Sequence, residues 1–582
     1  MSKKNVFTKL LQQISYQKQE KHQEFFIPEI KEQETLSDEI AIETQKQPKS
    51  KKEITPIADR KRKDEQPKVE AKQSVKKADK VFKQLKQNEE AFKQFFNAPI
   101  NKDVFFREFT TAANQQALII FLDGMASREV INDFILRPLL DHSRKEALEK
   151  GDFESVLLTN QLVKVETFDE VIKSILRGDS ALIIEGLAYI YISETKGFDK
   201  RSVEKPQVEA IVMGAQEAFN ENLKTNVVLI RRIIKNNHLT TEFLDYGTMN
   251  SGMCAVMYVD GLINPAIVDE VKRRINSLKV DHVDGSGFLE QMIEDNAMSI
   301  VPSVISTERP DKAAAHLMDG KVVIIAEGTP LALIVPITFY SLFQSPEDIS
   351  LRWQYATLIR LVRMVAFYIA LLLPSIYIAF TTFHQEMIPS DLLIAIAQAR
   401  EKVPFPTFVE VLTMLLAFEL IREAGIRVPG IIGNTIGIIG ALILGQAAVQ
   451  ANLVSPILII VVAVTGLGNL SIADYKMGFA ARILSFGFVV VSSILGIYGL
   501  TLGFVALMSY LFSIKSFGVP FFAGRYPKTA KGADMLIRYP AWQQEKRSDA
   551  LNPIVRRRQP DIAREWATSD ANTKPTEDKK DE

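Results

Sequence analysis

The chain has 582 residues, of which 70 are lysine or arginine and 70 are aspartate or glutamate, so its formal net charge is zero. This balance excludes a global field that would attract nucleic acid or an anionic substrate. The single cysteine, Cys254, excludes a disulfide framework and a paired-cysteine redox or zinc motif, and it fits a reducing compartment.

Both ends of the chain are polar. Residues 1–97 are rich in lysine, glutamate and glutamine, a composition that buries too little apolar surface to offset chain entropy, so we predict a disordered charged tail. Its charge runs could contact lipid headgroups or a partner, although a solvated tether is the simpler interpretation. The amino terminus is too polar for a secretory signal peptide. Residues 516–582 are predicted to form a cytoplasmic C-terminal tail.

An internal repeat organises the soluble part, residues 98–345. QALIIFLDGMASREVINDFILRPL predicts an apolar strand, an Asp-Gly turn, a Ser127 cap and a helix with one apolar face, formed by Val130, Ile131, Phe134 and Ile135. CAVMYVDGLINPAIVDEVKRRI, roughly 140 residues later, repeats this pattern with Asn264 as the cap and Pro265 at the first helical position. Its apolar stripe is Ile267, Val268, Val271 and Ile275.

ALIIEGLAYIYIS and VVIIAEGTPLALIVP form a second matched pair. Each predicts a strand, a Glu-Gly turn and a second strand, with Glu185 in the first turn and Glu327 in the other. Both pairs recur at similar offsets, which favours a single duplication. We therefore predict two α/β subdomains, at 98–200 and 238–345, joined by a helical signature segment at 201–237.

Residues 346–515 hold apolar runs long enough to cross a bilayer, which takes about 20 residues per helix. They predict a transmembrane domain of about six segments, at Arg363–Phe380, Thr407–Ile421, Ile431–Gln450, Pro456–Leu470 and the two halves of Ile483–Ile514. The fourth segment either spans or re-enters, and Gly496, Gly499 and Gly503 offer a break in the last run. The predicted fold class is an α/β soluble domain of two duplicated subdomains followed by an α-helical polytopic membrane domain.

Orientation follows from the lysines and arginines of the short connections. Arg360 and Arg363 precede the first span, whereas TTFHQEMIPSD after it has neither residue type. Both termini are therefore predicted to be cytoplasmic. Arg400 and Lys402 disagree with this alternation, and we interpret their segment as an amphipathic helix that lies in the interface.

Two acidic residues inside the apolar segments, Glu410 and Glu419, could line a cation path, because an ionisable group in a membrane is costly unless it faces water or a partner. The alternative is that both lie near the interfaces, with Glu419 paired to Arg422. A second polar set could face water, or it could only form hydrogen bonds between helices; it comprises Asn434, Thr435, Gln446 and Gln450.

Small residues recur every four positions in the third segment, at Gly433, Gly437, Ala441 and Gly445. They form one stripe along which another helix can approach closely. We predict that this helix belongs to the oligomer or pore wall, and the alternative is packing within one subunit.

The sequence offers little that an enzyme would need, and we predict no catalytic, cofactor-binding or metal site. None of the six histidines has a second ligand at helical metal-binding spacing, and a Walker-type GxxxxGK motif is absent. The Gly178-Asp179-Ser180 run is part of a predicted buried hairpin and lacks a recognisable histidine partner.

RSVEKPQVEAIVMGAQEAFNENLKTNVVLIRRIIK, from Arg201 to Lys235, closely resembles the signature of the GerA-type spore germination proteins, the A subunits of nutrient germinant receptors. EDNAMSIVPSVISTERPD, YSLFQSPEDIS, RVPGIIGNTIGIIGALILGQAAV and YPKTAKGADMLIRYP are also similar to that family. The matching signature residues are Glu217, Phe219, Glu221, Asn222, Thr225, Asn226, Arg231 and Arg232. One departure is Ala215-Gln216, where the family has Pro and Arg.

The resemblance implies an integral protein of the spore inner membrane in an endospore-forming bacterium, with both termini on the spore core side. It implies a transporter-like B subunit and a lipoprotein C subunit as partners. The complex would convert nutrient sensing into ion release, with this chain as an oligomeric ion channel. An accessory protein similar to stage V sporulation protein AF is the alternative within the family. A secondary carrier is less favoured, because carriers usually repeat their membrane halves.

Arg231 and Arg232 end the signature segment. Because a guanidinium group favours bidentate pairing, we expect both to bind carboxylates between subdomains or subunits. The alternative is that they are solvated arginines at a helix end.

Overall fold

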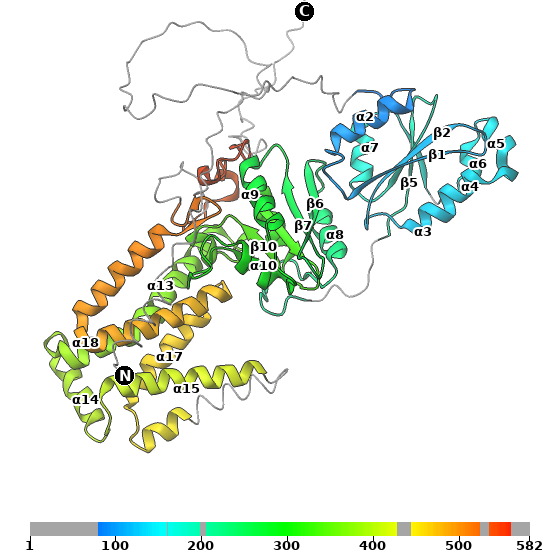
Figure 1. The fold of residues 1–582 in the computed structure, drawn as a ribbon. Helices are drawn as coiled ribbons and strands as arrows, with labels where there is room; N and C mark the ends of the chain where they lie inside the picture. The colour runs from blue at the N-terminus through cyan, green and yellow to red at the C-terminus, as the bar shows by residue number, and fades with distance from the viewer. Residues whose placement is uncertain (1–78, 160, 198–204, 428–443, 524–534, 560–582) are drawn as a thin grey trace, which may run out of the picture. The chain divides into compact units, whose positions relative to one another are not determined.

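The computed structural model describes residues 79–159, 161–197, 205–427, 444–523 and 535–559 (Figure 1). The described chain divides into two compact units. The N-terminal unit comprises residues 79–99 and 104–197, and the C-terminal unit comprises residues 100–103 and the described residues from 205 onward. Each unit has a hydrophobic core of its own.

A five-stranded antiparallel sheet forms the centre of the N-terminal unit, in the order β1-β2-β4-β5-β3. Its strands are β1 (Val104–Thr110), β2 (Gln116–Leu122), β3 (Leu162–Val165), β4 (Ser180–Ile184) and β5 (Ile190–Ser193). All of β2 after Gln116 is buried, which requires helices on both faces of the sheet.

Two groups of helices cover that sheet. α2 (Leu85–Phe95) and α7 (Phe168–Ile175) pack together, with the Phe92 and Phe168 rings 5.2 Å apart. The other group forms a core with alternate residues of β2 and β4, such as Ile119 and Leu182. It comprises α3 (Arg128–Val130), a π-helix (Ile131–Leu136), α4 (Arg137–Leu140), α5 (Lys145–Glu149) and α6 (Phe153–Val156).

The C-terminal unit contains a second five-stranded antiparallel sheet, in the order β6-β7-β9-β10-β8. Its strands are β6 (Leu239–Tyr246), β7 (Gly252–Val259), β8 (Ile305–Thr307), β9 (Val322–Ala326) and β10 (Ala332–Val335). This strand order repeats that of the first sheet, each strand number raised by five. The same topology in both sheets is what a duplication predicts.

Helices cover both faces of the second sheet as well. α9 (Pro265–Asn276) and α10 (Gly285–Ile293) pack on one face, where Cys254 and Val256 of β7 are fully buried. α8 (Leu223–Ile233) and α11 (Pro310–Met318) pack on the other face, against Ala255 and Met257. Successive β7 side chains belong alternately to the cores on the two faces of the sheet, because side chains along a strand point to opposite faces in turn.

The predicted repeat elements largely match the structure. Ser127 caps α3 by accepting from Val130 N, and Asn264 caps α9 by accepting from Ala266 N. Both Glu-Gly turns connect the strands expected, β4 to β5 and β9 to β10. The predicted stripe of the second repeat is entirely buried on α9.

The apolar face predicted for the first repeat is wrong at Phe134, which is exposed. The helix there changes to a π-helix at Ile131–Leu136. A π turn inserts an extra residue relative to the α-helical period, which rotates the side chains that follow. Ile131 and Ile135 remain buried, so the helix still packs on the sheet.

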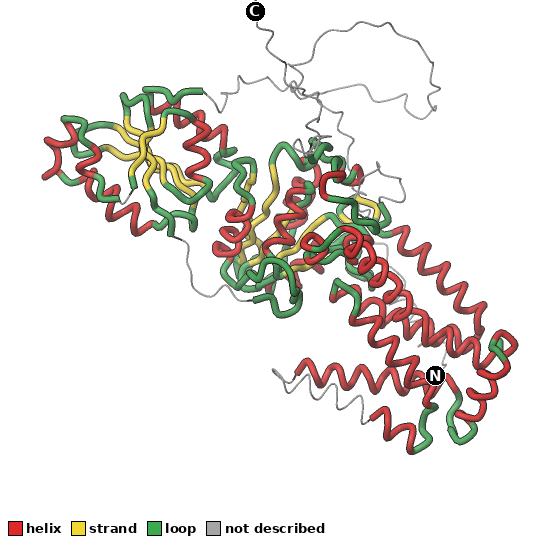
Figure 2. Tube along the Cα trace, turned by 180° about the vertical axis from the view of Figure 1, so that it is seen from behind, coloured by secondary structure: helices red, strands yellow, loops and turns green. Residues whose placement is uncertain are grey.

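Two helices of the C-terminal unit are long and apolar enough to cross a membrane: Trp353–Phe383, which is α13 (Trp353–Ile378) extended by a π turn (Ala379–Phe383), and α18 (Tyr475–Ser513). α17 (Pro456–Leu470) is apolar and shorter. α14 (Ser390–Arg400) and α15 (Thr407–Arg427) carry more charge. Figure 2 shows these helices grouped together. Most of the predicted third segment lies outside the described residues.

The predicted break in the last apolar run lies at Gly496 of α18. Its φ of 59° and ψ of −137° are not helical. A Cβ at this position would lie 2.9 Å from Phe383 Cβ and 3.0 Å from His384 Cε1. Glycine is therefore required both for the backbone conformation and for the close approach of the chain after α13.

Parts of both predicted tails are folded. α2 belongs to the segment assigned to the N-terminal tail, and Phe92 is fully buried. Residues 535–559, predicted to be part of the C-terminal tail, include short 3₁₀ helices at Ala541–Gln543 and Asp549–Leu551 and pack within the C-terminal unit. Apolar packing fixes α2, whereas arginine bonds to backbone carbonyls, such as that from Arg547 Nε to Met318 O at 2.9 Å, fix residues 535–559.

Candidate functional site

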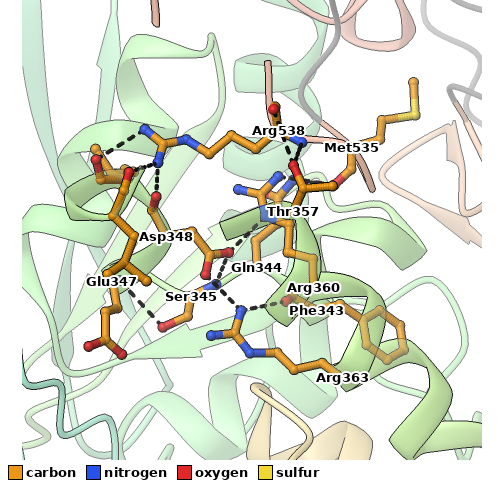
Figure 3. Close-up of polar contacts among 12 residues, drawn as sticks. Phe343, Gln344, Ser345, Glu347, Asp348, Thr357, Arg360, Arg363, Met535 and Arg538 are labelled. Atoms are coloured by element: carbon orange, nitrogen blue, oxygen red, sulfur yellow. Dashed lines mark hydrogen bonds and ion pairs between the residues drawn. The ribbon is translucent and has the colours of Figure 1, made fainter. Parts of the chain in front are cut away.

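A buried carboxylate lies where the α/β part of the C-terminal unit connects to α13. Asp348, in the short helix α12 (Glu347–Ser350), is fully buried. Arg360 Nε donates to its Oδ2 at 2.8 Å, and Arg363 Nη1 donates to its Oδ1 at 2.8 Å (Figure 3). The two arginines are three residues apart, so they lie on one face of α13. One carboxylate therefore fixes two consecutive turns of the helix.

Arg538 adds a third cation to this site from the far end of the sequence. Its guanidinium donates to the carbonyl oxygens of Asp348, Leu351 and Ile349, the last two at 2.8 and 3.0 Å (Figure 3). These carbonyls end α12, where the helix lacks its own donors. We call the group of Asp348, Arg360, Arg363 and Arg538 the Asp348 clamp.

The backbone around Arg538 strengthens the clamp. Arg360 Nη1 donates to Met535 O at 3.2 Å, and Arg538 N donates to Thr357 Oγ1 at 3.1 Å. Gln344 Nε2 also donates to Met535 O, at 3.3 Å. The C-terminal segment is thus bonded both to α13 and to the loop that precedes α12.

An aromatic cluster continues the core from the second sheet into the apolar helices. The Phe339 and Phe522 rings are 4.8 Å apart, and Phe343 and Phe367 are 5.5 Å apart, with Phe367 on α13. These rings belong to one core that also contains residues of α8, α11, α13 and α18. The second sheet and α13 therefore share one close-packed core.

A second attachment joins the α/β part to α18. Lys476, in the first turn of α18, bonds Glu290 of α10 and Ser306 of β8. Near the other end of that helix, Tyr510 Oη donates to Ser299 Oγ at 2.9 Å. Both long apolar helices are thus bonded directly to the second α/β part.

The signature residues shape the loop before α8 and the start of that helix. Asn222 caps α8 by accepting from Thr225 N at 3.1 Å. Asn226 is fully buried, and its side chain bonds both backbone groups of Asn220 at 2.9 and 2.6 Å. Glu221 O accepts from Gly328 N at 3.0 Å, which ties the segment to the turn between β9 and β10. The buried Phe219 anchors its other end.

The two arginines of the signature both pair with carboxylates. Arg231 is buried and binds Asp103 with two hydrogen bonds, of 2.7 and 2.9 Å, and Asn101 with a third, of 3.2 Å. Arg232 pairs with Glu217 at 3.2 Å, and both side chains are half-exposed. Asp103 and Asn101 belong to the C-terminal unit, so the buried pair holds residues 100–103 against that unit.

The departure from the family signature, Ala215-Gln216, lies beside the fully buried Arg309. Arg309 Nη2 donates to Ala215 O at 2.8 Å and to Asp311 Oδ2 at 2.8 Å. Gln216 donates to Ile211 O at 3.1 Å. Since Arg309 contacts a backbone carbonyl here, this contact does not depend on the side chain at position 215.

The two glutamates predicted within the apolar segments are both paired. Glu410 is buried, accepts from Arg400 Nε at 3.3 Å, and accepts from the backbone N of Ser455 at 3.2 Å. Ser455 caps α17, so this carboxylate lies at a helix N-terminus, where the dipole favours it. Glu419 pairs with Arg422 at 3.4 Å and with Arg482 at 3.5 Å.

Glu419 lines a cavity of about 540 Å³ between α13, α15, α17 and α18. The cavity wall is mostly apolar, and Arg422 and Arg482 complete its polar end. In the part of the chain that the structure describes, no cluster of three histidine, cysteine or carboxylate side chains could hold a metal ion.

The small-residue stripe falls largely outside the described residues, which do not include Gly433, Gly437 and Ala441. Asn434 and Thr435 of the polar set also lie outside them. Gly445 is buried, and a Cβ there would lie 3.7 Å from two side-chain atoms of Ile459 on α17. Gln446 and Gln450 are exposed on the same helix, of which residues 444–450 are described.

Comparison with known proteins places this geometry in a family. The family model described as Bacillus/Clostridium GerA spore germination protein matches residues 90–550, which include both sheets, the apolar helices and the Asp348 clamp. The chain belongs to the GerA family. Individual relatives support this assignment, since each matches most of this chain and most of its own length.

Among the GerA relatives is spore germination protein KA of Bacillus subtilis, which is 37% identical over 78% of this chain and 84% of its own. Spore germination protein GerLA of Bacillus cereus is 37% identical over 72% of this chain and 86% of its own. The solved N-terminal domain of the A subunit of the Bacillus megaterium spore germinant receptor GerK3 is 27% identical, with a TM-score of 0.36, over 45% of this chain and 99% of its own.

Sequence reasoning missed the Asp348 clamp of this GerA protein. In the sequence, Arg360 and Arg363 indicate only the orientation of the first apolar segment, and Arg538 falls in the predicted C-terminal tail. Their spacing of three residues directly before an apolar run was a usable signal, because two cations on one helix face predict a shared anionic partner. The identity of that partner depends on the fold, which brings α12 and the C-terminal segment together.

Proposed function

We propose that this chain is the A subunit of a spore germinant receptor and that it helps to convert nutrient sensing into ion release during germination. The observation that carries the proposal is the GerA match, which extends over the α/β parts and the apolar helices together. Two helices long and apolar enough to cross a membrane support membrane association. The location proposed is the spore inner membrane, with both termini on the core side. The proposed partners are a transporter-like B subunit and a lipoprotein C subunit.

In this proposal the α/β part receives a conformational signal from the partner subunits and passes it to the apolar helices. The Asp348 clamp and the shared aromatic core supply the mechanical connection to α13. Lys476 and Glu290 supply the connection to α18. Several copies of the chain would surround the ion path, with the stripe from Gly433 to Gly445 in the helix contacts and Glu410 or Glu419 at the path.

Ion release from spores tests this role. Spores of the source bacterium that lack the gene should fail to release monovalent cations in response to at least one nutrient in a panel of amino acids and sugars. Spores with Asp348→Asn should release them more slowly at equal membrane levels of the protein. Asp391→Asn, the same change at an exposed position of α14, should leave the rate unchanged. Normal responses of the deletion spores to every nutrient would contradict the receptor role.

Reconstitution separates a channel from a carrier. Liposomes that contain the chain alone, or the chain with its B and C subunits, should show ion flux that rises linearly with the gradient. A flux that saturates at turnover rates typical of carriers would contradict the channel proposal.

A further inference from the structure

A small basic pocket lies between the second α/β part and the C-terminal segment, and Met535, whose carbonyl oxygen accepts from Arg360 of the Asp348 clamp, is one of the residues that line it. The pocket has a volume of about 90 Å³. Residues from the end of α11, the segment 338–344 and the segment 544–558 line it. Since water occupies about 30 Å³ per molecule in the liquid, the space suits a few waters or one ion of phosphate size.

The C-terminal wall of the pocket is a hairpin formed by residues 545–558. Arg547 N donates to Arg556 O at 2.8 Å, and Arg558 N donates to Glu545 O at 2.7 Å. Arg547 Nε then donates to Met318 O at 2.9 Å, at the end of α11. The hairpin is thereby fixed over the turn that leads from α11 to β9.

Positive charge dominates the pocket lining. Four cationic side chains contribute, namely Lys321, Lys546, Arg547 and Arg558, against the single carboxylate of Asp319. Asp319 is already paired with Arg558 at 3.2 Å. Lys546 and Arg558 are exposed and Lys321 is buried, so Lys321 is the cation of this set that most needs a partner, because charges that leave water are normally paired.

Lys321 is the buried member of this set, with 8% of its surface exposed. Burial lowers the pKa of its ammonium group to about 8, and the attraction of Asp319 offsets this only in part. No hydrogen bond or ion pair joins its Nζ to another residue in the described part of the chain. A bound anion would supply the missing counter-charge.

His316, in the last turn of α11 and five residues before Lys321, provides a second unpaired group. It is 9% exposed, and its Nδ1 has no hydrogen-bond partner among the described residues. Burial and the neighbouring Lys321 and Lys312 hold the pKa of the imidazole well below its usual range, so it is neutral. A neutral imidazole still offers one N–H donor to an oxyanion.

We propose that this pocket binds a small oxyanion of phosphate chemistry, with Lys321 as its ion-pair partner and His316 as a hydrogen-bond donor. Arg558 and Lys546 on the hairpin complete the cationic surround. The anion would therefore join the hairpin to the turn between α11 and β9. Because Gln344 also lines the pocket and bonds Met535 O, binding would stabilise the segment that carries Arg538. This binding requires neither partner subunits nor a nutrient, so it is independent of the proposed receptor role.

Phosphate titration of the full chain tests the site. The protein is purified in detergent micelles in phosphate-free buffer, and binding of inorganic phosphate is measured by calorimetry and by the shift in melting temperature. Lys321→Met should weaken phosphate binding at least tenfold. Lys279→Met, the same change at an exposed lysine outside the pocket, should bind like the wild type.

A second variant keeps the test decisive if Lys321→Met does not fold. His316→Phe fills the cavity and removes the unpaired nitrogen, so it should also abolish phosphate binding. Nanodiscs of phosphatidylglycerol and of phosphatidylcholine, compared without phosphate, distinguish the source of the anion. If phosphatidylglycerol raises the melting temperature of the wild type but not that of either variant, the site binds a lipid headgroup. Equal affinity of the wild type and both variants, or no response to phosphate or to phosphatidylglycerol, would overturn the proposal.

Discussion

Adjacent residues of the same type have different roles in this protein because burial differs between them. Arg231 has 2% of its side chain exposed and binds a carboxylate that is equally buried, whereas Arg232 and its partner Glu217 are half-exposed. An exposed ion pair contributes little because water and salt screen it. Removal of one member of a buried pair leaves an uncompensated charge, which costs far more.

Arg231→Met should therefore lower the free energy of unfolding by about 3 to 5 kcal/mol, since it leaves Asp103 buried without its cation. Arg232→Met should lower it by about 1 kcal/mol or less. Denaturant unfolding in detergent micelles, compared between the wild type and each variant, would measure both changes. Similar losses for the two variants would contradict the assignment of Arg231 to a buried structural pair.

At the scale of elements, glycine decides where the last apolar helix breaks. Gly496 has a backbone conformation that other residues rarely adopt, and it lies against Phe383 and His384. Gly487, in the same helix, has no neighbour within 4 Å of the position its Cβ would occupy. The same substitution therefore has opposite consequences at the two positions.

Gly496→Ala should destabilise the protein by about 2 to 4 kcal/mol, because it combines backbone strain with a steric clash. Gly487→Ala should be neutral or stabilising by up to about 1 kcal/mol, since alanine favours a helix more than glycine does. Thermal unfolding in detergent micelles compares the two variants. Equal stability of both would show that the break at Gly496 does not require glycine.

At the scale of the whole molecule, the cores of the two units contain different residues. Phe153 of α6 belongs to the core of the N-terminal unit, and Ile267 of α9 belongs to a core of the C-terminal unit. Both side chains are at most 2% exposed. Separate cores predict that a cavity in one unit destabilises that unit alone.

Phe153→Ala should increase hydrogen exchange in β2, β4 and β5 and leave β7 and β9 unchanged, because removal of the ring costs the local core about 3 to 5 kcal/mol. Ile267→Ala should produce the reverse pattern, with a cost of about 2 to 5 kcal/mol. Mass spectrometry of the peptides measures hydrogen exchange in both units in one sample. Increased exchange throughout the chain in either variant would indicate a single cooperative unit.

The sequence by itself determined the elements whose signals are local. Apolar periodicity and caps located the two repeated strand-helix units, as Ser127 and Asn264 show. Glycine located the break at Gly496, and apolar length located α13 and α18. Each of these depends on residues close together in the chain, so that pattern and spacing are sufficient.

Only the tertiary structure decided which distant groups meet. Asp348 and Arg538 are far apart in the sequence, and nothing in either local pattern selects the other. The same holds for Arg231 with Asp103 and for Lys321 with the hairpin above it. The π-helix that accompanies the exposure of Phe134 was likewise not indicated by the local apolar pattern. Ion pairing and burial depend on position in three dimensions, and a charged residue therefore has no fixed role until the fold supplies its surroundings.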